Sequence, residues 1–264
     1  MDNKFKVALV GIAKAEENYL KEWVDYHLKI GFDEIFIYQN DWTYPKQDIT
    51  DERVHFGSIS GLGMQTKCYN DFIMKYKDVF DFAAFIDIDE FLWLRDTTDV
   101  HEFLKDYFSD EAMFVNWRLF GDNGLAEVKD GNYSVIKRFT RCSNDLNPLG
   151  KNIINLRLTQ GNVLFHNPHI LITKNGAHRT KDPTRQKVAV CGTIYNNNIS
   201  EPCELYHYRN KTFQELVERR YNKYDPSCPV MSPSHTDMDV IKKEFVEHNR
   251  NDCENTNLVK IMES

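Results

Sequence analysis

The sequence lacks an apolar run long enough to cross a membrane. Near the N-terminus, the apolar stretch from Val7 to Ala13 spans only seven residues, and the residues before it are mixed in charge. A membrane-spanning helix needs about 20 apolar residues, and a secretory signal needs a basic start before a longer apolar core. We therefore expect a cytoplasmic protein without a transmembrane segment. A peripheral membrane contact near the proline-rich stretch 226–233 stays open as an expectation.

Cysteine pairs of the C-x-x-C type are also missing. The absence of such pairs excludes a zinc ribbon and a thioredoxin-like redox motif. In a cytoplasmic protein, scattered cysteines are predicted to be reduced thiols. The chain has six of them, which are Cys68, Cys142, Cys191, Cys203, Cys228 and Cys253.

Positive charge and glycine-rich phosphate loops are scarce. The chain has 33 Lys and Arg against 40 Asp and Glu, which gives a net charge of −7. A broad electrostatic attraction to nucleic acid is therefore excluded, and an anionic ligand must be held by local cations or by a metal. Gly61-Leu62-Gly63 lacks the third glycine of a dinucleotide fingerprint and follows the third predicted strand, so we exclude a Rossmann dinucleotide site.

What is present is an alternation of strand and helix patterns in the first third of the chain. Strands are predicted at 6–12, 34–38, 53–59 and 82–86, and helices at 17–30 and 64–76. Gly31 is a plausible C-terminal cap of the first helix. This alternation predicts an α/β fold with a doubly wound, mostly parallel sheet that has helices on both faces.

The later sequence predicts a mixed or antiparallel second half followed by C-terminal helices. The expected elements are a helix at 99–107 capped by Thr98, strands at 112–120, 162–165 and 169–173, and helices at 213–224 and 236–248. Thr212 and Glu215 form a capping-box pattern before the first C-terminal helix. The last ten or so residues are expected to fray. We predict a domain at 1–210, with a nucleotide half (about 1–95) and an acceptor half (96–210), and a helical extension at 211–264.

Three carboxylates follow the fourth predicted strand, at Asp87, Asp89 and Glu90. Like charges this close raise one another's pKa values unless a cation lies beside them. Mg²⁺ and Mn²⁺ prefer carboxylate and phosphate oxygens, and ligands of doubly wound sheets bind at the carboxyl ends of strands. The position therefore favours a metal that carries a nucleotide diphosphate, although an acid that caps the next turn is the alternative.

The chain contains its own comparison for this pattern. Asp237-Met238-Asp239 has the same D-x-D spacing, but it begins a predicted helix, where acids cap the first turn and favour the helix dipole. We assign that second pair a structural role. The D-x-D spacing alone is therefore weak evidence for a metal site. The predicted buried strand before Asp87 is what favours such a site at the first pair.

Other polar segments fit the same chemistry, each beside a simpler alternative. Lys14 and Glu16 follow the first strand, where Lys pairs with phosphate, but they also suit a solvated helix start. Further candidates on or near later elements are Gln65, Lys67 and Asn70 for a sugar nucleotide, Trp117 and Arg118 for a sugar ring, Asp122 for a catalytic base, and His207. Surface polarity, or packing in the core for the aromatic residues and His207, is the alternative for each.

Five segments together resemble a family. They are VALVGIAKAEENYLKEWVDYHLKIGFDEIFIYQND, GMQTKCYNDFI, FAAFIDIDEFLWL, NWRLFGDNG and LYHYRNKTFQELVERR, in this order between residues 6 and 220. The sequence is similar to the family 2-like and family 92-like glycosyltransferases, whose D-x-D-E-F segment matches residues 87–91. The resemblance implies a GT-A fold, a nucleotide-sugar donor and a divalent metal, usually Mn²⁺, with Mg²⁺ as the alternative.

The resemblance also implies roles for individual residues. Asp87 would contact the ribose or the metal, Asp89 would bind the metal, and His207 would be a late metal ligand. The nucleotide pocket would be lined by Lys14, Glu16, Asn40 and Gln65.

The expected function is transfer of a sugar, with a UDP-sugar as the first candidate donor, to a hydroxyl of a glycan or lipid-linked acceptor in cell-surface polysaccharide synthesis. Asp122 is the first candidate for a base, should the reaction invert the sugar. A sugar-phosphate nucleotidyltransferase shares the sheet and the metal chemistry, and a non-catalytic carbohydrate-binding protein is a further alternative. The sequence leaves these alternatives open.

Overall fold

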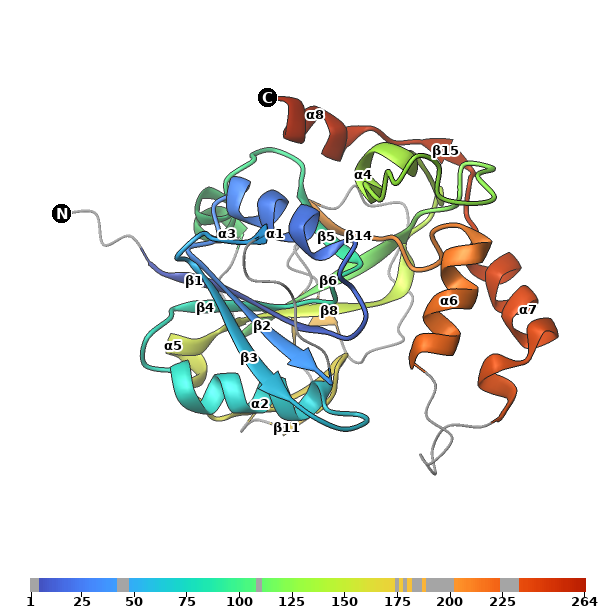
Figure 1. Ribbon diagram of the computed structural model, residues 1–264. Coiled ribbons are helices and arrows are strands. Elements are labelled where there is room, and N and C mark those ends of the chain that lie inside the picture. The colour runs from blue at the N-terminus through green and yellow to red at the C-terminus, as the bar shows by residue number, and fades with distance from the viewer. Residues whose placement is uncertain are drawn as a thin grey trace.

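The computed structural model describes residues 5–41, 48–107, 111–173, 176–177, 180–181, 187–188, 202–223 and 233–264. A large sheet forms the centre of the molecule, with α1 (Leu20–Lys29) and α3 (Val100–Tyr107) on one face and α2 (Gln65–Tyr76) on the other (Figure 1). This arrangement confirms the predicted α/β fold with a doubly wound, mostly parallel sheet.

The first third of the chain supplies the parallel part of the sheet. Its order is β4-β1-β2-β3, and all three neighbouring pairs are parallel. The strands are β1 (Val7–Ala13), β2 (Glu34–Asn40), β3 (Val54–Ile59) and β4 (Phe82–Phe85). The predicted strands are confirmed within one or two residues. Gly31 follows α1 with a φ of +97°, a conformation that glycine adopts without steric cost and that ends the helix.

The second half of the chain extends the sheet with strands of both directions. β8 (Asn147–Asn155) pairs antiparallel with both β4 and β6 (Ala112–Leu119), and β14 (Cys203–His207) pairs parallel with β6 and antiparallel with β5 (Glu90–Leu94). Because β8 is antiparallel to both β4 and β6, β6 runs in the same direction as β4. β14 is parallel to β6 and therefore also runs parallel to β4. The predicted mixed second half is confirmed, but β5, β8 and β14 were not predicted as strands.

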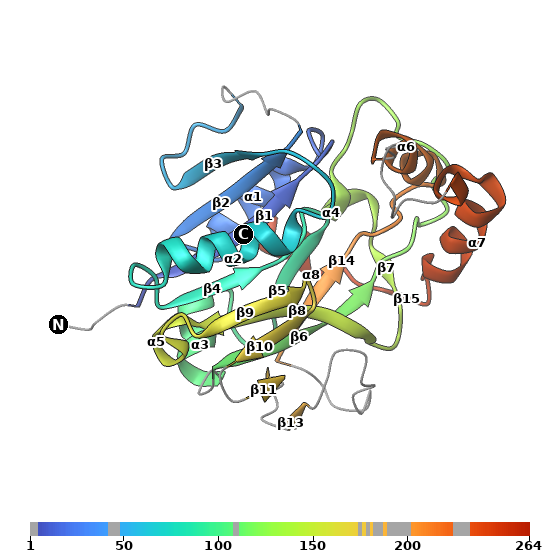
Figure 2. The same ribbon diagram turned by 90° about the horizontal axis from the view of Figure 1, so that it is seen from below.

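The remaining elements complete the chain. They are α4 (Val135–Arg138), β7 (Arg141–Cys142), α5 (Leu156–Thr159), β9 (Val163–Asn167), β10 (Ile170–Thr173), β11 (Gly176–Ala177), β12 (Thr180–Lys181), β13 (Lys187–Val188), α6 (Phe213–Lys223), a 3₁₀ turn at Pro233–Thr236, α7 (Met238–His248), β15 (Cys253–Glu254) and α8 (Asn257–Glu263). The view from below in Figure 2 shows α2 and the β9–β10 pair on one side of the large sheet.

The hydrophobic core lies on both faces of the sheet, and β4 shows why. Phe82 and Ala84 belong to the cluster with α1 and α3, whereas Ala83 and Phe85 belong to the cluster with α2. Successive side chains of a strand point to opposite faces, so a strand buried on both sides reads as a continuous apolar run. The apolar run Phe82–Phe85 before Asp87 is therefore explained by the burial of β4 on both faces of the sheet.

Two local predictions need correction. Thr98 was predicted to cap α3, but the Asp99 carboxylate accepts the hydrogen bond from the His101 backbone N–H at 2.7 Å. The end of the chain, its last ten or so residues, was predicted to fray. Instead it forms α8, whose Leu258 belongs to the main core cluster. Burial of this apolar face stabilises the helix and offsets the entropy lost when the last residues become ordered.

Several other predictions concern termini, linkers and caps. The capping box is confirmed, since Thr212 N–H donates to Glu215 at 3.0 Å and Glu215 N–H donates to the Thr212 hydroxyl at 3.2 Å. Asp237 caps α7, as expected of the second D-x-D. The domain boundary at residue 210 stays a prediction. Cys191 and Cys228 lie outside the described residues, and the other four cysteines are free thiols.

Candidate active site

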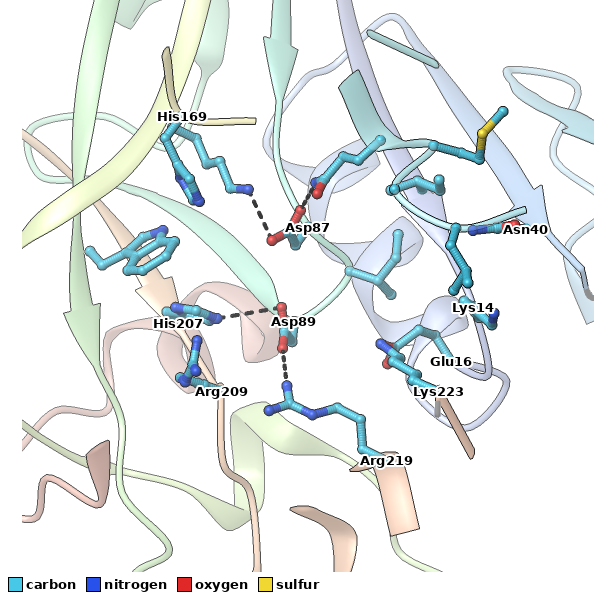
Figure 3. Close-up of a pocket in the computed structure, with 18 residues that line it drawn as sticks. Lys14, Glu16, Asn40, Asp87, Asp89, His169, His207, Arg209, Arg219 and Lys223 are labelled. Atoms are coloured by element: carbon cyan, nitrogen blue, oxygen red, sulfur yellow. Dashed lines mark hydrogen bonds and ion pairs between the residues drawn. The ribbon is translucent and has the colours of Figure 1, made fainter. Parts of the chain in front are cut away.

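A cavity of about 360 Å³ opens at one edge of the sheet, where the carboxyl ends of β1, β2, β4 and β14 meet (Figure 3). Parallel strands place their carboxyl ends at one edge, and doubly wound sheets bind ligands there. Eight of the predicted site residues line this cavity. They are Lys14, Glu16, Asn40, Gln65, Asp87, Asp89, Trp117 and His207.

Asp87 is held by donors on both carboxylate oxygens. Lys151 Nζ lies 2.9 Å from Oδ2, and the Gln65 side-chain amide donates to Oδ1. Tyr69, on α2, reaches the same oxygen at 3.5 Å. Burial raises the pKa of the Asp87 carboxyl, but the Lys151 ammonium outweighs burial and leaves the pKa below its ordinary value. Asp87 is therefore an anion whose partners come from the protein itself.

The contacts of Asp89 are longer than those of Asp87 with Lys151 and Gln65. His207 Nε2 lies 3.5 Å from Oδ1, and Arg219 Nη1 donates to Oδ2 at 3.2 Å. Burial raises the pKa of this carboxyl as well, but His207, Lys211 and Arg219 together hold it well below its usual range. Figure 3 shows Asp89 between these two partners, with its carboxylate facing the cavity.

Glu90 lies beneath the pair and does not line the cavity. Its side chain is fully buried, and Oε2 accepts a hydrogen bond from the Asp87 backbone N–H at 2.9 Å. Burial and the nearby Asp87 carboxylate both raise the Glu90 pKa well above its ordinary value. Glu90 is therefore a neutral acid that supports the turn between β4 and β5. The third carboxyl of the motif thus has a structural role.

His207 ends β14 as a neutral imidazole. Burial lowers its pKa and outweighs the attraction of Asp89. Its ring lies 4.4 Å from the Trp117 ring, centroid to centroid, and Trp117 also lies 5.3 Å from the ring of His169. Neutral imidazole is the form that binds a metal. Together the three rings form an aromatic wall on one side of Asp87 and Asp89.

Buried polar atoms without a hydrogen-bond partner gather at this cavity. Among the described residues, five lining residues carry such an atom, and they are Asn40, Trp117, Lys151, His207 and Arg209. Each unpaired buried polar group costs roughly 1–3 kcal/mol, so folded proteins keep few of them. Lys151 still has the Asp87 carboxylate at ion-pair distance. The concentration of the others at one cavity indicates that a polar ligand completes them.

The remaining predicted residues lie outside the lining. Lys67 is exposed on α2, and Asn70 holds β9 through two hydrogen bonds with the Phe165 backbone. Arg118 pairs with Glu204 through two hydrogen bonds. Asp122 accepts hydrogen bonds from Gly124 N–H and Asn251 in a turn.

Comparisons with known proteins find only weak structural likeness. No family model and no curated protein matches the sequence. Among solved structures, Rv0371c from Mycobacterium tuberculosis H37Rv is 10% identical with a TM-score of 0.30, over 44% of this chain and 67% of that one. A second structure of that protein, at 9% identity, is a complex with manganese, and the match covers 43% of this chain and 65% of that one.

Two further structures match a larger share of the chain. HddC from Yersinia pseudotuberculosis is 11% identical with a TM-score of 0.32, over 58% of this chain and 78% of that one. The 4-diphosphocytidyl-2C-methyl-D-erythritol synthase from Anaerococcus prevotii is 10% identical with a TM-score of 0.33, over 60% of this chain and 73% of that one. Likeness at these scores carries no argument about activity, so the resemblance to glycosyltransferases stays a prediction.

Sequence reasoning missed half of the titratable residues that line the cavity. The missed residues are Lys151, His169, Arg209, Arg219 and Lys223. Lys151 offered one signal, because it is a lone Lys in the strand-like run from Gly150 to Asn155. A Lys that must be buried in a strand needs an acidic partner. Arg219 and Lys223 lie on α6 one turn apart, and only the tertiary fold brings them to Asp89 and Glu16.

No helix among the described residues has the length and apolar character needed to span a bilayer. Among the same residues, no group of three or more His, Cys, Asp and Glu side chains is arranged to hold a metal ion alone. A metal in this cavity would take its further ligands from water or from a substrate. That is the usual situation for Mg²⁺ and Mn²⁺ with nucleotide phosphates, where the protein supplies one or two ligands.

Proposed function

We propose that this protein is a metal-dependent glycosyltransferase that uses a nucleotide sugar, with a UDP-sugar as the first candidate. The acceptor would be a hydroxyl of a glycan or of a lipid-linked sugar, in cell-surface polysaccharide synthesis. The observation that carries the proposal is the pair of Asp89 and His207, 3.5 Å apart, in a cation-rich cavity at the carboxyl ends of the strands.

Asp89 and His207 suit a divalent cation by their chemistry. One offers a carboxylate oxygen and the other a neutral imidazole nitrogen, a donor set that favours Mn²⁺ over Mg²⁺. Both face each other across a gap that is long for a hydrogen bond. Asp87 is less suited as a ligand, because Lys151 and Gln65 already occupy its oxygens. When bound, the metal would supply Lewis-acid stabilisation of the departing diphosphate.

The opposite wall of the cavity would take the nucleotide. Asn40, at the end of β2, is 7% exposed and has an unpaired Oδ1 that would accept from a base or ribose. Lys14 and Glu16 follow β1, with Lys14 Nζ 3.7 Å from Asp41 and Glu16 bound to Lys223 at 2.6 Å. Lys14 and Lys223 would shift onto phosphate oxygens, because a phosphate competes well for an ammonium group.

The aromatic wall would take the acceptor sugar. Trp117 presents a ring face and an unpaired Nε1–H, which suit the apolar face and the hydroxyls of a sugar. The proposal gives no role to Lys67, Asn70, Arg118 or Asp122, whose side chains lie outside the cavity lining.

A second candidate is a sugar-phosphate nucleotidyltransferase. The cavity holds Lys151 within 2.9 Å of Asp87 in addition to Lys14, Arg209, Arg219 and Lys223, and so many cations would also suit a nucleoside triphosphate. One of the similar solved structures is named a 4-diphosphocytidyl-2C-methyl-D-erythritol synthase. A purely carbohydrate-binding protein has less support, because sugar recognition alone needs neither this charge nor the Asp89–His207 pair.

The products distinguish these candidates. Purified protein is incubated with Mn²⁺ and either a panel of UDP-, GDP- and TDP-sugars or a nucleoside triphosphate with sugar 1-phosphates. We expect release of the nucleoside diphosphate from one sugar donor. Release of pyrophosphate from the triphosphate, without cleavage of any nucleotide sugar, would overturn the glycosyltransferase in favour of the second candidate. Sugar binding with neither reaction would favour the carbohydrate-binding protein.

A further inference from the structure

The cavity is positively charged, although the chain as a whole carries −7. Its lining has five cationic side chains, which are Lys14, Lys151, Arg209, Arg219 and Lys223. It has three carboxylates, which are Glu16, Asp87 and Asp89. This count leaves out the two lining histidines, His169 and His207. Five positive and three negative groups leave a net charge of +2 at the site.

The surplus persists when the next shell of charges is added. Glu244 on α7 is shared, because it pairs with Arg209 at 2.8 Å and also with Arg220. The positive charge of Arg220 and the negative charge of Glu244 therefore add nothing to the net charge of the site. Lys14 has Asp41 nearby, but buried Lys211 adds a further positive charge, so these two also cancel. The cavity keeps about two more cations than anions within its immediate surroundings.

Arg209 is the cation with spare binding capacity on the acceptor side. Its Nη2 donates to Glu244, while its Nε is buried with no partner among the described residues. In Figure 3, Arg209 and His207 lie on one side of Asp89, whereas Lys14 and Asn40 lie on the other.

The charges of the donor complex leave this surplus in place. A nucleotide diphosphate sugar carries about two negative charges, and Mn²⁺ carries two positive ones, so the pair is neutral together. The remaining +2 must then be met by the second substrate or be left uncompensated in a partly buried site, which is costly. Trp117 Nε1 and Arg209 Nε add two unpaired donors on the acceptor wall.

We propose that the acceptor carries an anionic group, a phosphate or a carboxylate, which binds Arg209 beside the aromatic wall formed by Trp117, His169 and His207. This inference rests on the proposed glycosyltransferase function and narrows its acceptor to acidic sugars or sugar phosphates. Arg209 would bind the anion through its guanidinium, and its Nε–H and the Trp117 indole N–H, both buried in the free protein, would reach the anion as these side chains adjust. Guanidinium groups are well matched to phosphate and carboxylate oxygens.

The test compares three sugars of similar size by calorimetry. Glucose, glucose 6-phosphate and glucuronate are titrated into the protein, once alone and once saturated with UDP and Mn²⁺. We expect at least one anionic sugar to bind about tenfold more tightly than glucose, as a charge-assisted hydrogen bond to a guanidinium would provide. The two anionic probes distinguish a phosphate site from a carboxylate site.

Variants locate the effect. Arg209→Gln is expected to remove the preference for the anionic sugar, Arg209→Lys to keep part of it, and Trp117→Phe to weaken it while the ring remains. Arg53→Gln is the matched control, because Arg53 pairs with Asp51 on the exposed approach to β3 and should leave the preference unchanged.

The outcomes separate this inference from the proposed function. Equal binding of glucose and both anionic sugars, or no binding of either anionic sugar, overturns the anionic acceptor. A loss of UDP affinity in Arg209→Gln as large as the loss of sugar affinity assigns Arg209 to the donor and also overturns it. Tight binding of an anionic sugar by a protein that does not bind any nucleotide with Mn²⁺ would overturn the glycosyltransferase and leave the anion site standing.

Discussion

The Nζ atom of Lys151 lies 2.9 Å from Oδ2 of Asp87, and only 1% of the Lys151 side chain is exposed. Lys151 comes from β8 and Asp87 from the end of β4, so the ion pair joins two neighbouring strands of the sheet. The same ammonium lies 4.0 Å from Glu90. This buried cation therefore keeps Asp87 ionised, whereas the charge of Asp89 depends on His207, Lys211 and Arg219.

Replacing this lysine tests that relationship. Lys151→Met keeps a similar length but leaves the Asp87 carboxylate without its buried partner, so we expect a loss of about 3–5 kcal/mol in the free energy of unfolding. Urea unfolding followed by circular dichroism measures it. Lys21→Met is the matched control, because Lys21 forms an exposed i,i+4 pair with Asp25 and should cost less than about 1 kcal/mol. Equal costs for the two variants would contradict the assigned role.

His207 is predicted to bind Mn²⁺ directly. His207→Gln should weaken the binding of Mn²⁺ in the presence of UDP by at least about tenfold, as loss of an imidazole ligand would. Electron paramagnetic resonance of free Mn²⁺ during a titration measures this without any need for turnover. His166→Gln is the control, because His166 is exposed on β9 and lies outside the cavity lining. An unchanged Mn²⁺ affinity in His207→Gln would remove this residue from the metal site.

Glu215 gives a prediction about acid stability. Burial raises its pKa, but hydrogen bonds from Arg138, Thr212 and Tyr19 lower it to about 2. A carboxyl whose pKa falls on folding stabilises the fold fully above its unfolded pKa of 4.5, and this contribution is lost as the pH falls from 4.5 to about 2. Glu215→Gln should therefore cost roughly 3 kcal/mol at pH 7.

The cost should shrink below pH 4.5, because the unfolded chain then takes up a proton at Glu215 while the folded protein, with a Glu215 pKa of about 2, does not. Urea unfolding at pH 7, 4 and 3 measures the difference. Glu218→Gln, on the exposed side of the same helix, is the control and should change little at any pH. A cost for Glu215→Gln that does not depend on pH would show that packing, and not the ionised carboxylate, stabilises α6.

The parallel half of the fold and the two central carboxylates of the site, Asp87 and Asp89, could be predicted from the sequence. Both are indicated by patterns within a few neighbouring residues. The run Phe82–Phe85 is apolar because β4 is buried on both faces, and Asp87 and Asp89 follow it immediately. The Thr212–Glu215 capping box likewise acts within one turn. Where the cause of a feature lies within a few residues, the sequence carries it.

The rest of the site depends on contacts between distant segments. Lys151 is 64 residues beyond Asp87, and Arg219 is 130 residues beyond Asp89. No pattern in the residues around Lys151 or Arg219 predicts that they bind Asp87 and Asp89. Asp122 illustrates the opposite case, since a turn sequence with an acid resembles a functional loop, but Asn251 from near the chain end binds its carboxylate.

The most direct test of the central claim is the affinity for UDP with Mn²⁺ and with a chelator, in wild-type protein, in Asp89→Asn and in Asp237→Asn. We expect wild-type protein to bind UDP at least tenfold more tightly with Mn²⁺, which corresponds to about 1.4 kcal/mol. Asp89→Asn should lose this difference. Asp237→Asn, which changes the other D-x-D at the start of α7, should keep it. Equal UDP affinity with and without Mn²⁺ in the wild type, or an undiminished metal effect in Asp89→Asn, would contradict a metal–diphosphate site at Asp89.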